Sequence, residues 1–249
     1  RVHAPEYIEA VRTGEPRALA GSSGLGWDEQ RYLLTTVSTG AIIAAAVAAW
    51  RERTVTGATS SGLHHACHDH GAGYCTFNGL VVAAMEVLAA GANRILIVDL
   101  DAHCGGGTAS LIESVPGIEQ VDVSVIAYDT YESRPDARVE IVGADGYLDA
   151  VRRALAAVEQ PGTIDLVIFN AGMDVHEDAG GIEGIDDSVV RMRDRIVMRW
   201  AEAHDLPLAF TAAGGYLSPY LTMDGVAALH GITYEEAMRS IGRRHQVAA

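Results

Sequence analysis

Residues 95–107 read ILIVDLDAHCGGG, an apolar run that passes directly into acids, a histidine and three glycines. A short apolar run that ends in this way is typical of a strand buried on both faces of a sheet, here Ile95–Leu100. Similar runs occur at Val55–Thr59, Val121–Ala127, Leu166–Phe169 and Leu208–Ala212. Stretches with helical spacing lie before and between them, at Asp28–Arg53, Gly79–Ala90, Gly146–Val158 and Ser188–His204. This alternation predicts an α/β fold, a parallel β-sheet with helices on both faces.

The composition favours one globular domain over residues 1–249. Hydrophobic residues make up 49% of the chain, enough for a sizeable core, and no linker divides it. Acids outnumber bases 33 to 18, and the net charge of −15 argues against nucleic acid and anionic membranes as partners. The most apolar run, Ala41 to Trp50, is shorter than the ~20 residues of a membrane span. The absence of a signal peptide at the start and three cysteines without disulfide-like spacing predict a cytoplasmic protein.

Polar, glycine-rich segments follow four of the predicted strands. They are the segment with His64 and His65, then VDLDAHCGGG (98–107), NAGMDVHED (170–178) and AAGGY (212–216). Ligands of open α/β sheets bind outside the carboxyl ends of the strands. We therefore expect these segments to meet at one edge of the sheet.

Two of these segments contain the donors of a metal site. Asp99, Asp101 and His103 alternate along the chain, so in extended backbone they share one face. Asp101 and His103 can offer an oxygen and an imidazole nitrogen to one metal, and Asp174 can add a second oxygen. One histidine and two carboxylates leave room for water and substrate, as in catalytic zinc sites. The alternative is that the acids are helix caps or ordinary loop residues.

Groups suited to proton transfer lie in the other two segments. His64 and His65 are adjacent, and a histidine can take up and return a proton near neutral pH. Tyr216 follows two glycines, and its phenol could donate a hydrogen bond to a developing oxyanion. Taken alone, a tyrosine in such a position is more often a packing residue.

Five motifs together resemble one known family. They are GLHHA (62–66), GAGYCTFN (71–78), VDLDAH (98–103), NAGMD (170–174) and GGY (214–216). In order and approximate spacing they resemble the zinc-dependent histone deacetylase family of the arginase/deacetylase fold, including its bacterial amidohydrolase members. NAGMD is most similar to class IV-like and bacterial members.

The resemblance implies roles for the predicted site. Asp101, His103 and Asp174 would bind Zn²⁺, with Fe²⁺ as an alternative metal, and the backbone near them would hold a structural K⁺. His65 would be the general base and then the acid, and Tyr216 would polarise the acyl carbonyl.

Further roles follow from the same resemblance. His64 would lie beside the attacking water and be held by Asp99. Gly73 and Tyr74 would line the tunnel for the acyl-lysine stem, with Tyr74 in place of the usual phenylalanine. Asp28, in the segment GLGWD (24–28), would bind the substrate backbone.

Two departures from the family pattern stand out. Gly106 occupies the position, three residues after the histidine ligand, where the family usually has Asp or Asn to orient the general base. Glycine cannot supply that contact, so we expect a water or a backbone carbonyl to orient His65. The chain begins with RVHAPEY, which resembles a point well inside the family's domain, so we expect the N-terminal part of that domain to be missing.

The leading hypothesis is a hydrolase that removes an acyl group from lysine, a polyamine or another small amine. One alternative is an inactive member that retains the fold as a metal-binding or interaction module. A second is an arginase-like ureohydrolase, although its two-metal aspartate patterns are missing here. For the histidine-rich loop itself, a structural zinc knuckle made by Cys67, His68, His70 and Cys75 is the rival interpretation.

Overall fold

The computed structural model describes residues 2–60 and 63–247, apart from the side chains of His245 and Val247. Gly62 of the motif GLHHA lies outside the described residues. All the pairings between neighbouring strands of the six-stranded sheet are parallel, in the order β1-β6-β5-β2-β3-β4. The strands are β1 (Val55–Ala58), β2 (Ile95–Asp99), β3 (Ile118–Ser124), β4 (Ala137–Ile141), β5 (Leu166–Gly172) and β6 (Leu208–Ala213).

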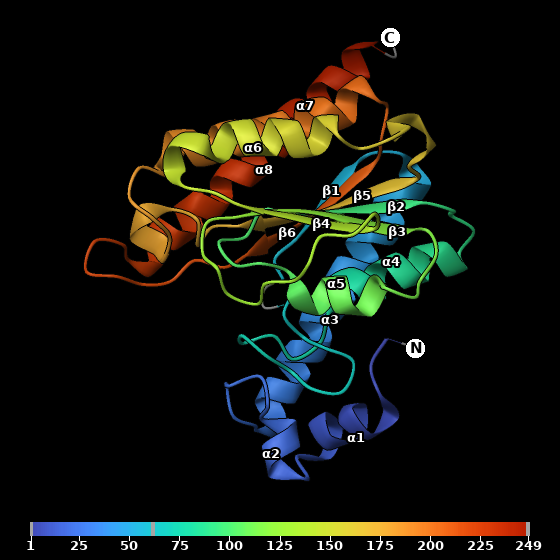
Figure 1. Cartoon of the computed structure of the whole chain (residues 1–249), viewed down its shortest axis with the longest axis vertical. Helices are drawn as coiled ribbons and strands as arrows, with labels where there is room; N and C mark the ends of the chain where they lie inside the picture. The colour runs from blue at the N-terminus through green and yellow to red at the C-terminus, as the bar shows by residue number, and fades with distance from the viewer. Residues whose placement is uncertain (1, 61–62, 248–249) are drawn as a thin grey trace.

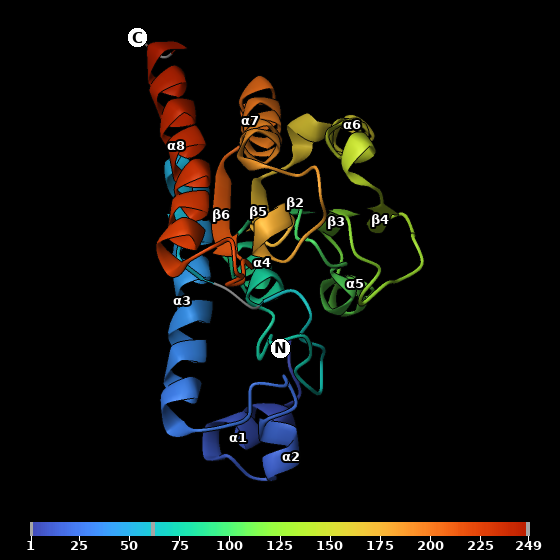
Figure 2. The same cartoon turned by 90° about the vertical axis from the view of Figure 1, so that its left-hand side faces the viewer.

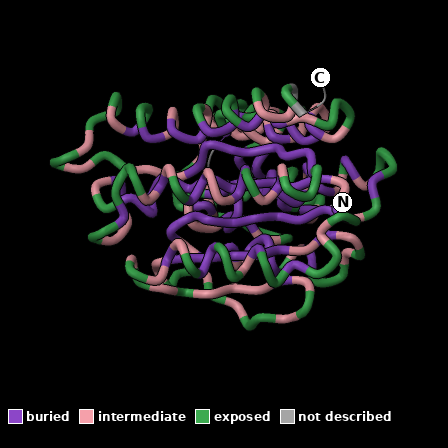
Figure 3. The backbone as a smooth tube through the Cα atoms, turned by 90° about the horizontal axis from the view of Figure 1, so that it is seen from above, coloured by how far each residue is buried: buried purple, intermediate pink, exposed green. Residues whose placement is uncertain are grey.

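Helices cover both faces of this sheet (Figure 1). One face carries α6 (Ala144–Ala156), α7 (Asp187–Ala203) and α8 (Met223–Val247), and the other carries α3 (Glu29–Glu52), α4 (Gly79–Ala89) and α5 (Gly106–Ile112). Alternate residues of β2 enter the two cores: Leu96 and Val98 join one hydrophobic cluster, whereas Ile95 and Ile97 join the other. This accounts for the unbroken apolar run, and in Figure 3 buried residues run through the middle of the molecule. The predicted fold class is confirmed.

Most of the expected elements are present within a few residues of their predicted bounds. The third strand is shifted, because it begins at Ile118 rather than Val121 and ends at Ser124. Elements not expected from the sequence are the edge strand β4, the short α5, the C-terminal α8, and the two N-terminal helices α1 (Pro5–Thr13) and α2 (Arg17–Ala20). The edge strand has only one buried residue, Ala137, so it shows no apolar run.

Helix α3 is longer than its most apolar segment. It is capped by Asp28, whose carboxylate accepts a hydrogen bond from the Arg31 amide at 2.7 Å. By length and composition alone, α3 is long and apolar enough to cross a membrane. The expectation from the sequence considered only the apolar run 41–50, which is too short for a membrane span. Core helices of globular proteins pass the same test, and the C-terminal half of α3 packs against α4, β1 and β6 with Ile42, Ala46 and Ala49 buried.

The N-terminal helices support the histidine-rich loop. Both pack at the far end of α3, away from the sheet (Figure 2). The Tyr7 hydroxyl donates a hydrogen bond to the Thr76 carbonyl at 2.7 Å, and the His3 ring bonds the Cys67 carbonyl at 2.8 Å. The segment between β1 and α4, which carries His64 and His65, is therefore held by groups more than sixty residues away in the sequence.

Candidate active site

The predicted site residues meet at the carboxyl edge of the sheet. In the strand register Asp99 of β2 lies beside Asn170 of β5, and Asn170 lies beside Thr211 of β6. The loops that leave these aligned strand ends, together with the segment after β1, line one cavity of about 530 Å³. Its lining includes His64, His65, Gly73, Tyr74, Asp101, His103, Asp174 and Tyr216. The predicted convergence is confirmed.

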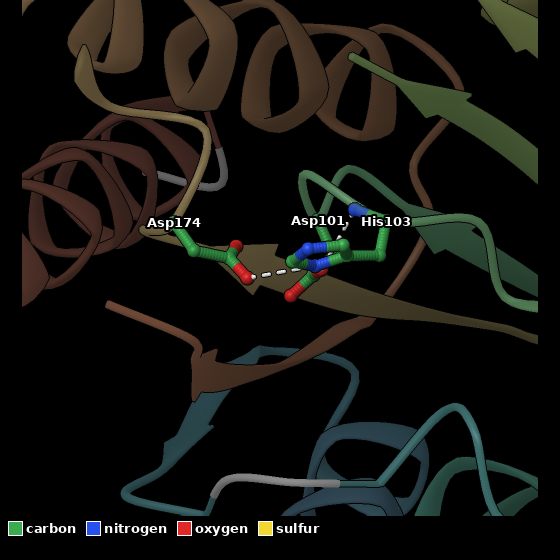
Figure 4. A group of neighbouring side chains, drawn as sticks. All are labelled: Asp101, His103 and Asp174. Atoms are coloured by element: carbon green, nitrogen blue, oxygen red, sulfur yellow. Dashed lines mark hydrogen bonds and ion pairs between the residues drawn. The ribbon is translucent and has the colours of Figure 1, made fainter. Parts of the chain in front are cut away.

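Asp101, His103 and Asp174 form a compact group of ligand atoms (Figure 4). The His103 Nδ1 atom lies 3.2 Å from an oxygen of Asp101 and 3.2 Å from an oxygen of Asp174. One ligand atom from each residue can be chosen so that all three lie within 4.8 Å of one another. Two carboxylates and one imidazole with an open side suit a catalytic divalent cation, so the donor set fits the zinc that the resemblance implies.

The electrostatics of the group also favour a cation. Burial, together with the neighbouring charge of Asp101, raises the pKa of Asp174 to about 6. Hydrogen bonds to Asp101 and Asp174, opposed by burial, raise the pKa of His103 to about 9. Without a metal, a proton on His103 partly neutralises the two carboxylates, and a divalent cation would take over that role.

His64 is held as expected. Its Nδ1 lies 2.9 Å from an Asp99 oxygen, and the other Asp99 oxygen accepts a hydrogen bond from the Asn170 amide at 2.8 Å. Burial lowers the pKa of His64, but Asp99 and Asp101 outweigh it and raise the value to about 10. A cation bound to Asp101 would oppose that increase. Asn170 lies within the motif NAGMD, yet its contact with Asp99 was not foreseen.

His65 has a carboxylate partner that the sequence did not reveal. Its Nδ1 lies 2.8 Å from an oxygen of Asp129, a residue in the loop between β3 and β4. The expectation that a water or a backbone carbonyl orients His65 is therefore wrong. Burial and the adjacent His64 lower the pKa of His65, and Asp129 opposes this only partly.

Aromatic residues surround the approach to the two histidines. Tyr74 and Tyr216 are about half exposed and line the cavity, as expected. Tyr128, which the sequence did not indicate, lines an adjoining cavity, and its ring packs edge-on against His65 and His103 with centroids 5.0 and 5.7 Å apart. Like Asp129, it lies in a loop without an apolar pattern.

Two further predictions fare differently. The Asp28 carboxylate caps α3, and Asp28 is not among the described residues that line the cavity, so its substrate-binding role stays a prediction.

The zinc-knuckle interpretation of the histidine-rich loop finds no support. Within residues 63–247, the metal-like grouping does not include Cys67, His68, His70 or Cys75. His68 instead bonds the Val2 carbonyl at 2.7 Å, and His70 bonds Asp69.

Comparison with known proteins agrees with this geometry. The histone deacetylase domain model matches residues 1–137, more than half of the chain. An uncharacterized protein of Picosynechococcus sp. is 31% identical over 223 residues, which cover 86% of this chain and 74% of that protein. The chain belongs to the histone deacetylase family. Histone deacetylase 2 of Arabidopsis thaliana is 29% identical over 188 residues, which cover 72% of this chain and 48% of that protein.

A solved histone deacetylase structure shares the fold. The HD domain of HDA15 superimposes with a TM-score of 0.71 at 20% identity, covering 96% of this chain and 72% of that domain. Family members are generally zinc-dependent, and the Asp101, His103 and Asp174 group is where this histone deacetylase fold offers a metal site. The chain therefore spans about three quarters of the length of that domain.

Proposed function

We propose that this protein is a metal-dependent deacetylase that hydrolyses a linear acyl amide on lysine, a polyamine or another small amine. The observation that supports this most is that one cavity holds the metal-like group and two histidines, each hydrogen-bonded to its own carboxylate. An arrangement of this kind suits attack by an activated water on an amide. Membership of the deacetylase family agrees with the same chemistry.

Asp101, His103 and Asp174 would hold the metal. A zinc ion, when bound, acts as a Lewis acid and lowers the pKa of a bound water to about 7. The residues of the chain supply the proton transfers. With its Nδ1 bonded to Asp129, His65 has Nε2 left to accept a proton from water and to return it to the departing amine.

His64 and Tyr216 would stabilise charge. The Nδ1 of His64 is hydrogen-bonded to Asp99, whose charge favours the protonated ring, and this leaves the Nε2 side of His64 to donate a hydrogen bond near the attacking water. Burial and the carboxylates of Asp174 and Asp101 raise the pKa of Tyr216, so its phenol keeps its proton and can donate it in a hydrogen bond to the acyl oxygen.

The cavity linings favour an alkyl stem. Among the described residues, the linings of the two adjoining cavities contain no lysine or arginine, and their only carboxylates are Asp101 and Asp174. Between the rings of Tyr74, Tyr128 and Tyr216, a chain of methylene groups can be buried against aromatic surface. A cationic amine farther along such a chain can also interact with these rings.

The test compares acyl amides on the purified, zinc-loaded protein. A fluorogenic acetyl-lysine amide and an acetylated diamine are assayed with and without a hydroxamate inhibitor, and again after the metal has been removed by chelation. Hydrolysis that is lost on chelation, restored by zinc and blocked by the hydroxamate supports the proposal. No hydrolysis of either substrate by fully metallated protein would contradict it.

A further inference from the structure

Gly106 lies against a carboxylate from another loop. It opens α5, where the family pattern usually has Asp or Asn. A Cβ atom added at Gly106 would meet the backbone oxygen and the carboxylate of Asp129, with the Asp129 Cγ only 2.7 Å away. No side chain can therefore occupy position 106 while Asp129 keeps its place.

Asp129 is placed to hold the imidazole of His65. One of its oxygens lies 2.8 Å from His65 Nδ1 and also accepts a hydrogen bond from the Gly107 amide at 3.0 Å. The His65 side chain is 5% exposed, and that of Asp129 is 26% exposed. The backbone φ of Asp129 is 56°, a left-handed conformation that aspartate adopts more readily than most residues.

We propose that Asp129 is the positioning residue for the general base His65, and that glycine at position 106 leaves the space that the Asp129 carboxylate occupies. The contact with the Asp129 oxygen keeps the proton of neutral His65 on Nδ1, so that Nε2 is free to accept a proton. The orienting carboxylate thus comes from the loop between β3 and β4 and not from the start of α5. This inference rests on the proposed function only for its effect on turnover.

The first test does not require activity. Long-range ¹H–¹⁵N NMR of histidine-labelled protein distinguishes the two neutral tautomers of His65, measured with and without zinc. We expect the Nδ1-protonated form in the wild type and in Asp129→Asn, because a single oxygen accepts both hydrogen bonds and an amide oxygen can replace it. Asp129→Ala should show the Nε2-protonated form or a mixture. The same tautomer in Asp129→Ala as in the wild type would overturn the proposal.

The second test separates positioning from general structural damage. Asp129→Ala should lower kcat at least about 10-fold, because general acid–base catalysis contributes roughly 10²–10⁴ in rate. KM, zinc content and melting temperature should change little, and Asp129→Asn should recover most of the turnover. Asp69→Ala is the matched control, because Asp69 also contacts a histidine Nδ1 at 2.7 Å, but at an exposed site. Equal losses in Asp129→Asn and Asp129→Ala would contradict the hydrogen-bond role.

The third test concerns the coupling of the two positions. Gly106→Ala introduces only a methyl group, yet it should lower kcat by displacing the Asp129 carboxylate. In an Asp129→Ala background the same substitution should change kcat less than about twofold, because its main target is gone. The same fold loss in both backgrounds would show that Gly106 acts independently. If the wild type hydrolyses no acyl amide while the tautomer depends on Asp129, the proposed function fails and the positioning role stands.

Discussion

Replacing Asp174 with asparagine should make the metal-free protein more stable than the wild type and the metal-loaded protein less stable than the wild type. Asp174 is buried beside Asp101, which raises its pKa from 3.8 to about 6. A rise of this size in the pKa corresponds to about 3 kcal/mol. Because the folded-state pKa is the higher one, this free energy is lost from the native state as the pH rises from about 4 through 6. Above pH 6 the metal-free wild type therefore holds an ionised carboxylate at a cost of up to about 3 kcal/mol.

Asparagine removes that charge and keeps the shape of the side chain. Its oxygen can still accept the hydrogen bond that the Ala102 amide donates to Asp174 at 3.2 Å. His103 loses one of its two carboxylate partners, which offsets part of the gain. At pH 8 without metal we expect Asp174→Asn to melt up to about 10 °C above the wild type, at about 2–4 °C per kcal/mol.

With metal the order should reverse. A ligand at 1,000 times its dissociation constant stabilises the native state by about 4 kcal/mol, and the variant, with one carboxylate ligand fewer, should gain much less. The assay is thermal unfolding from pH 4 to 8, in chelator and in excess zinc, with metal content measured in parallel. The control is Asp149→Asn, which removes the charge of a well-exposed carboxylate of α6.

The metal-free gain should shrink below pH 6 and become small near pH 4, where Asp174 is protonated in the folded state and about half protonated in the unfolded chain. Two outcomes would refute the reasoning. One is a metal-free variant less stable than the wild type at pH 8. The other is wild-type zinc content and an unchanged zinc-dependent rise in melting temperature.

Three further predictions follow from single contacts. Tyr216→Phe should keep zinc content and melting temperature but lose about 10²–10³ in kcat, and wild-type turnover would remove Tyr216 from the mechanism. Burial and the charge of Asp99 raise the pKa of Asp122, so the contribution of this residue to stability should fall as the pH rises from 4 to 8. Asp122→Asn should remove that part of the pH dependence in denaturant titrations, and an unchanged pH dependence would contradict this. Gly57→Ala would place a methyl group against the ring of Phe210, 2.7 Å from its Cε atoms. The variant should be destabilised by about 1–3 kcal/mol in urea unfolding. An unchanged unfolding midpoint would mean that the ring moves aside at no cost.

The strands and the metal-like group could be predicted from the sequence because both depend on local pattern. Apolar runs such as Ile95–Asp99 are buried on both faces, so their composition reports their place in the sheet. Asp101 and His103 follow such a run directly, and Asp174 follows another. Parallel strands deliver their following loops to one edge, so the meeting of these three side chains could be predicted from chain order alone.

Elements whose stability comes from tertiary contacts were missed. The edge strand β4 and the N-terminal helices α1 and α2 show no distinctive apolar run, because only a few of their residues are buried. The extent of α3, in contrast, was predicted almost to the residue, as Asp28–Arg53 against the observed Glu29–Glu52. Its N-terminal half has little burial, and its helical extent depends on the Asp28 cap and on the packing of its C-terminal half.

By itself the sequence determined the parallel α/β fold, the carboxyl-edge site and the identity of the metal-like group, since each follows from residues adjacent to a buried strand. Only the tertiary structure decided what orients His65. Gly106 indicated that the usual partner was missing, but nothing in the pattern around Asp129 marked it as the replacement. The contact spans 64 residues, and it exists because the loop after β3 fills the space that a side chain at position 106 would need.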